Sequence, residues 1–268
     1  DLTDRNRTSP FAFTGNKFEF RMVPSSMSIA NPNIILNTAV ADILSEFADE
    51  LEKSTNINAD MQELIAKVYR AHKRVIYNGN NYSGEWVEEA TKRGLANITN
   101  TVDALMELAK DYSIELFDRH DVFTRQELES RNEIQLEAYS QQINIEASIM
   151  IELTKKQVFP AAGEYIRQLS GTIEGLKASD FKGNTSFDKL LEKVAKTADI
   201  LYENIETLEE LLLHTQEVES SPYDQARAYR TQVFTKMADL REASDTLETL
   251  IPCDLWPIPT YLDLLFRL

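Results

Sequence analysis

The sequence predicts a mainly α-helical protein, with long helices, an antiparallel helical hairpin and one short β-strand near the N-terminus. There is no glycine between Gly94 and Gly163 and no proline between Pro32 and Pro160. Because these two residue types interrupt helices most strongly, such gaps favour long, uninterrupted ones. In contrast, apolar and charged residues alternate without a break over 17–22, which is the pattern of a strand.

Helix start and stop signals divide the chain from residue 31 onward. Asn31-Pro32 predicts a helix start, with the Asn as the cap and the Pro at the first helical position. Thr124 and Glu127 have the spacing of a capping box, and Phe159-Pro160 predicts a helix end. We therefore expect helices at about 31–53, 58–76, 83–93, 100–110, 124–158 and 161–178.

A helical hairpin is predicted over residues 185–250. Apolar residues recur every three or four positions on both sides of a turn at Ser221-Pro222. Two such helices bury their stripes against each other, so ordinary core packing explains the pattern. After the hairpin, the three prolines of 252–259 exclude a helix there. The apolar residues of 252–268 should dock on the body of the protein or on another subunit.

The composition excludes several classes of partner. With 28 basic and 44 acidic residues, the net charge of −16 argues against binding to nucleic acid. No apolar run approaches the ~20 residues that span a bilayer, so we expect no membrane association. Cys253 is the single cysteine, which excludes an intrachain disulfide and makes the cytoplasm the expected location.

The chemistry-bearing residues are expected near the N-terminus. His72, His120 and His214 share no metal-ligand spacing, Cys253 has no histidine close in sequence, and no nucleotide-binding or nucleophile motif is present. Residues 1–24 carry four basic and three acidic side chains, a local charge of +1 within an acidic chain. By elimination, we expect any site chemistry in residues 5–21.

The alternating stretch is open to two interpretations. Its apolar members would share one face of the strand, and its charged members, Lys17, Glu19 and Arg21, would share the other. That face could be a solvated surface, or it could bind a metal ion on the acid and anions on the bases. No partner strand is evident nearby, although a sheet needs neighbours. For this reason, and because the chain starts at Asp1 without a Met, we expect a fragment or a processed chain.

Several ordered segments closely resemble type III glutamine synthetases. They are 6–21, which contains Asn6-Arg-Thr-Ser-Pro and Gly15-Asn-Lys-Phe-Glu-Phe-Arg21, together with 25–33, 78–90, 93–95 and 256–266. The resemblance implies an α+β parent enzyme. That enzyme makes glutamine from glutamate, ammonia and ATP, with Mg²⁺ or Mn²⁺, through γ-glutamyl phosphate. It also implies stacked hexameric rings, that is, a dodecameric homo-oligomer.

The resemblance assigns roles residue by residue. Glu19 matches the metal-binding carboxylate, and Arg21 matches the arginine that holds glutamate. Arg7 matches the catalytic arginine that contacts both the substrate and the transferring phosphoryl group. Lys17 falls where shorter types have an arginine near the nucleotide phosphates. Ala12 departs from the pattern, because shorter types carry a phosphate-binding arginine there.

These assignments divide the chain into four expected parts: the end of the catalytic domain with the active-site strand, a helical part of that domain, a helical bundle or hairpin extension, and a docking segment. They span 1–30, 31–120, 121–251 and 252–268. We expect the chain alone to be inactive, because the other active-site walls would lie upstream. The alternative is a non-enzymatic helical module for interaction or oligomerisation.

Overall fold

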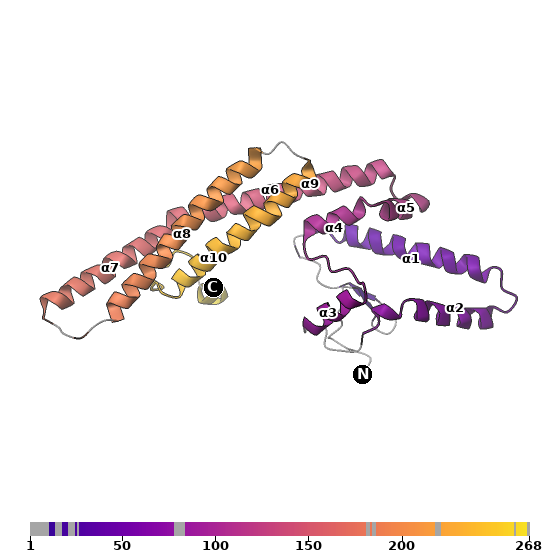
Figure 1. Ribbon diagram of the computed structural model, residues 1–268, viewed down its shortest axis with the longest axis horizontal. Helices are drawn as coiled ribbons and strands as arrows, with labels where there is room; N and C mark the ends of the chain where they lie inside the picture. Colours follow the sequence, from indigo (N-terminus) through magenta and orange to yellow (C-terminus); the bar gives the residue numbers. More distant parts are fainter. Residues whose placement is uncertain are drawn as a thin grey trace. The chain divides into compact units, whose positions relative to one another are not determined.

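The computed structural model describes residues 11–13, 18–20, 25, 27–77, 84–180, 183, 186–217, 221–259 and 261–266. They are mainly helical and separate into two compact units (Figure 1). The N-terminal unit comprises residues 1–132 and the C-terminal unit residues 133–268. No helix in the described part of the chain is long and apolar enough to cross a membrane.

The N-terminal unit begins with a two-stranded hairpin. β1 (Phe11–Phe13) pairs antiparallel with β2 (Phe18–Phe20), so that Phe11 lies opposite Phe20, Ala12 opposite Glu19 and Phe13 opposite Phe18. β2 falls within the alternating stretch of the sequence. We expected no partner strand nearby, but β1 directly precedes β2. Its three residues are too few for an alternating pattern to be recognised.

Five α-helices and a short 3₁₀ turn follow in this unit. They are α1 (Ala30–Leu51), α2 (Ile57–Ala71), η1 (Lys73–Val75), α3 (Gly84–Lys92), α4 (Thr101–Leu108) and α5 (Asp111–Arg119). The predicted cap of α1 is wrong. The helix begins before Asn31, and the Ala30 N–H donates to Ser28 Oγ at 3.2 Å. α4 lies where a helix was expected at about 100–110, and it is capped by Asn100, whose side chain accepts from the Asp103 N–H at 2.9 Å.

The predicted helix break at Pro160 is also wrong. α6 (Arg125–Leu153) continues through η2 (Thr154–Val158) into α7 (Phe159–Ala178) without a change of direction (Figure 1). η2 is a π-turn, in which the Phe159 N–H donates to the Thr154 carbonyl five residues earlier. Pro160 lacks an N–H and its ring crowds the preceding turn, and the wider π-turn accommodates both effects.

The start of α6 follows from a local signal. The Thr124 N–H donates to Glu127 Oε2 at 2.8 Å, and the Glu127 N–H donates to Thr124 Oγ1 at 3.3 Å. This is the predicted capping box. The boundary between the units, after Asn132, falls within α6.

The C-terminal unit contains the predicted hairpin. α8 (Ser186–Glu217) packs against α7 and against α10 (Phe234–Glu248), which follows α9 (Pro222–Ala228) and the π-turn η3 (Tyr229–Val233). At the predicted Ser221-Pro222 turn, Ser221 caps α9, because its Oγ accepts from the Asp224 N–H at 3.2 Å. Fully buried side chains join these helices in one cluster, which includes Val194, Leu201, Ile205, Leu208, Val233 and Leu247.

The proline-rich segment after α10 is not helical over 252–259, as predicted. Ile251 and Trp256 are buried in the main cluster, so this segment docks on the body of the unit. The short helix α11 (Tyr261–Phe266) follows, and its Leu264 and Leu265 are exposed.

Candidate functional site

The site predicted from the sequence centres on the β1–β2 hairpin. Glu19 is the middle residue of β2, and in the pairing register it lies directly across from Ala12. Arg7, Lys17 and Arg21 lie outside the described residues, and of Glu19 the structure describes the backbone alone. The roles of these four side chains therefore stay predictions. The register brings position 12, the departure from the family pattern, next to the predicted metal-binding residue.

Elsewhere in the described residues, no group of three or more His, Cys, Asp or Glu side chains is arranged to hold a metal ion. His72 and His214 are exposed, and Cys253 is exposed with a free thiol.

One charged cluster, which the sequence analysis missed, joins α1 to the end of α5. Arg119 Nη1 donates to Asp42 Oδ1 at 2.8 Å, and His120 Nε2 lies 2.9 Å from the same oxygen. The hydrogen bond from His120, followed by the Arg119 charge and hydrogen bond, lowers the pKa of Asp42. The partners are 77 and 78 residues apart, so no local sequence signal could have found the cluster.

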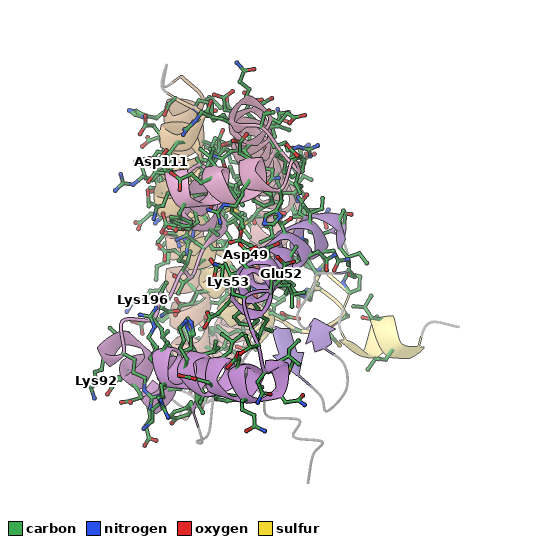
Figure 2. All side chains as sticks on the ribbon, turned by 90° about the vertical axis from the view of Figure 1, so that its right-hand side faces the viewer. Asp49, Glu52, Lys53, Lys92, Asp111 and Lys196 are labelled. Atoms are coloured by element: carbon green, nitrogen blue, oxygen red, sulfur yellow. The ribbon has the colours of Figure 1, made fainter. Side chains whose placement is uncertain are left out.

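A second cluster connects α4 to α5. Lys110 Nζ donates to Glu107 Oε1 at 2.6 Å, and the Tyr112 hydroxyl donates to Glu107 Oε2. The lysine and then the tyrosine lower the pKa of Glu107, whose carboxylate in turn raises the pKa of Tyr112. Both clusters are explained by ordinary helix–helix attachment. Other charged residues, such as Asp49, Glu52, Lys53, Lys92 and Lys196, are exposed on helix ends and surfaces (Figure 2).

The C-terminal unit has a groove of about 800 Å³ between α6, α10 and the docked segment. Its lining is largely apolar and includes Ile149, Leu153, Phe234, Met237, Trp256 and Ile258. Trp256 Nε1 is buried without a hydrogen-bond partner among the described residues. Apart from Thr154, Arg241 and Ser244, the polar residues that line the groove are acidic: Glu146, Asp245 and Glu248. It has the character of a contact surface and lacks the converging polar groups of a catalytic site.

Comparison with known proteins identifies the family. Residues 60–177 match the model of the glutamine synthetase C-terminal domain. The chain is 35% identical, over 99% of its length, to a protein named type-3 glutamine synthetase from Dictyostelium discoideum, of which it covers 37%. It is 36% identical, over 100% of its length, to a glutamine synthetase from Butyrivibrio fibrisolvens, of which it covers 38%.

A glutamine synthetase from Bacteroides fragilis (strain YCH46) is 31% identical over 99% of the chain, which covers 38% of it. The chain thus spans less than two fifths of the length of the relatives that it matches, while nearly all of its own length is matched. The chain belongs to the glutamine synthetase family and corresponds to a C-terminal portion of its type III members.

Proposed function

We propose that this chain contributes one wall of the active site of a glutamine synthetase. That enzyme would ligate ammonia to glutamate with ATP, through γ-glutamyl phosphate. The observation that carries the proposal is identity of 35% and 36% to proteins named glutamine synthetase over 99% and 100% of the chain. Such continuous similarity includes the N-terminal segment in which the predicted site residues lie.

In this proposal each charged residue around β2 has a separate role. Arg21 binds the carboxylate of glutamate, and Arg7 contacts both glutamate and the phosphoryl group in transfer. Lys17 lies near the nucleotide phosphates. Arginine suits the first two roles because its planar guanidinium grips a carboxylate or phosphate with two hydrogen bonds. Fixed cations stabilise the charge that spreads over the phosphoryl oxygens in the transition state.

Glu19 would be one ligand of a divalent cation, Mg²⁺ or Mn²⁺. A single carboxylate fits this role, because Mg²⁺ is commonly bound by one or two carboxylates together with substrate phosphates and water. When bound, the cation neutralises charge on the phosphates of ATP. The pairing of Ala12 with Glu19 supports the view that position 12 borders this site without supplying a charge of its own.

We further propose that the chain alone does not form glutamine. It covers 37% of the Dictyostelium relative and 38% of the Butyrivibrio relative, and the facing walls of the active site would lie in the uncovered portion. The working enzyme would be a cytoplasmic homo-oligomer built from hexameric rings that stack as a dodecamer.

The test uses a chimera in which this chain replaces the matching portion of the Butyrivibrio enzyme. Glutamine formation from glutamate, ammonia and ATP is measured for the chimera and for the isolated chain, which should be inactive. Arg21→Ala in the chimera should lower kcat/KM for glutamate at least about thirtyfold, or roughly 2 kcal/mol, as expected for losing a charge-paired contact.

Arg70→Ala is the matched control, because Arg70 is exposed near the end of α2. Its kcat/KM should stay within about threefold of the chimera. An Arg21→Ala enzyme with nearly unchanged kcat/KM would contradict the assignment of Arg21. Glutamine formation by the isolated chain would contradict the proposal that other walls are needed.

The second candidate function is a helical module for interaction or oligomerisation. The observation that favours it is the largely apolar groove beside α10 in a unit that has its own extensive core. Deleting 185–250 from the chimera separates the two functions. Loss of assembly with intact glutamate and ATP binding would favour the module, whereas loss of ligand binding would favour a direct catalytic contribution.

A further inference from the structure

One side of α2 carries an uncovered row of large apolar residues. Ile57, Met61, Ile65 and Tyr69 follow one another every four positions and are 55%, 42%, 50% and 65% exposed. We call these four residues the α2 ridge. Rows of side chains at this spacing are the ridges that pack into the grooves of a neighbouring element. A soluble helix normally turns such a row toward a core, so its exposure indicates a missing neighbour.

The α2 ridge is distinct from the sides of α2 that are already in use. α2 packs against α1, and Leu64 is its buried side chain. Lys67 Nζ forms an ion pair with Glu50 Oε2 of α1 at 2.8 Å. At about 100° per residue, Lys67 projects roughly 160° away from Ile65. The ion pair and the α2 ridge therefore lie on different sides of the helix, and α1 does not cover the ridge.

The unit to which α2 belongs has a small core. Among the described residues of the N-terminal unit, six apolar side chains are buried: Leu64, Val102, Leu105, Ile114, Phe117 and Leu128. A self-sufficient domain of about this length normally buries more than 60% of the surface that its unfolded chain exposes, around a contiguous core. The unit also contains a sheet of two strands, which is marginal without neighbouring strands. Both features indicate that another polypeptide segment completes this unit.

We propose that the α2 ridge packs against the portion of a type III glutamine synthetase chain that precedes this one. This inference rests on the proposed function, since it needs the longer enzyme. The relatives have more than half of their length outside the matched region, which supplies ample chain to cover the ridge.

A second copy of this chain fits the ridge less well. A stable interface between proteins buries about 800 Å² on each partner. A 15-residue helix is only about 22 Å long, and one row of four side chains offers well below that area. A continuous chain, in contrast, pays no cost of association and can use a small surface.

Thiol labelling tests the proposal directly. Cys253→Ser removes the native thiol, and Ile65→Cys then places a label site on the α2 ridge. Glu63→Cys is the matched control, because Glu63 is exposed on the opposite side of the same helix. Each variant is made in the isolated chain and in the chimera, and its rate of reaction with a maleimide is followed by peptide-resolved mass spectrometry.

The Ile65→Cys site should react readily in the isolated chain and at least about tenfold more slowly in the chimera. In the chimera the thiol would be buried, and a local opening must expose it before it can react. The Glu63→Cys site should react at similar rates in both. Equal rates at Ile65→Cys in the two proteins would overturn the proposal. So would a rate in the isolated chain that falls as its concentration rises, because a second copy would then cover the ridge.

The labelling and activity measurements test the docking surface and the proposed function separately. Protection of the ridge in a chimera whose Arg21→Ala variant is unimpaired would leave the docking surface standing and remove the assigned role of Arg21. A chimera that loses activity on Arg21→Ala but leaves the α2 ridge unprotected would support the role of Arg21 and remove the docking surface.

Discussion

The two units of this chain differ in how well they bury their own apolar side chains. Among the described residues, the C-terminal unit buries 23 apolar side chains and leaves 11 large ones exposed. The N-terminal unit buries six and leaves 16 exposed. Since apolar burial is the main favourable term in folding, the described core stabilises the C-terminal unit more than the N-terminal unit.

This difference agrees with what the two units are proposed to do. The N-terminal unit carries the hairpin with the predicted site residues and would need the upstream part of the enzyme to complete both its core and its active site. The C-terminal unit is a helical bundle with an interior of its own. In the proposed enzyme, the active site would combine segments distant in sequence, whereas a helical bundle can fold on local contacts.

The largest expected effect is a difference in hydrogen exchange between the units of the isolated chain. Backbone amides in the middle of α8 and α10 should exchange at least about 1000-fold more slowly than those of α1 and α2, a difference of roughly 4 kcal/mol in opening free energy. Mass spectrometry of peptides from the four helices measures this. Similar protection in both units would remove the basis of the comparison.

The next effect concerns the core of the C-terminal unit. Leu208 is 0% exposed on α8, and Leu208→Ala should lower the free energy of unfolding by about 3 kcal/mol through lost burial and the cavity left behind. Leu213→Ala on the same helix is the control. Leu213 is 61% exposed, so the change should stay within about 0.5 kcal/mol. Urea unfolding followed by circular dichroism gives both values, and equal losses would argue against a packed core at Leu208.

The smallest effect concerns the attachment of α1 to α5 in the N-terminal unit. The pKa of Asp42 is lowered in the folded state, first by the hydrogen bond with His120. Its contribution is therefore present above the unfolded-state value and is lost as the pH falls through the lowered pKa. Asp42→Asn should reduce thermal stability near neutral pH, and the deficit should shrink as the solution is acidified.

Asp49→Asn is the control for that measurement, because Asp49 is exposed on the same helix (Figure 2). Its melting temperature should follow that of the parent chain at every pH. A deficit for Asp42→Asn that stays constant down to about pH 3 would mean that the charge of Asp42 does not hold α1 to α5.

Local signals predicted much of the fold. The capping box at Thr124 and the turn at Ser221-Pro222 both appear in the structure, because each depends on hydrogen bonds within a few residues. The prediction failed where the neighbouring backbone could adapt to a residue that usually ends a helix. Pro160 does not end its helix, since the π-turn at 154–158 precedes it. The prediction also missed β1, because a strand of three residues is too short to show an alternating pattern.

The candidate functional residues also fall into two groups, those proposed from the sequence and those found only in the structure. Its residues Arg7, Lys17, Glu19 and Arg21 were proposed from sequence alone, and family membership supports that reading without testing any single role. The Asp42–Arg119–His120 cluster and the groove beside Trp256 were invisible in the sequence. Both depend on contacts between side chains that are tens of residues apart in the sequence, and no spacing rule predicts such contacts.

By itself, the sequence determined the helical class, the hairpin at 185–250 and the family, because periodicity, caps and motifs are local properties of the chain. Tertiary structure alone decided where the apolar surface remains uncovered. Ile65 and Leu208 are both apolar members of amphipathic helices, yet one is 50% exposed and the other 0%. Periodicity states that a helix has an apolar face, but whether that face is covered depends on which other elements are present to pack against it.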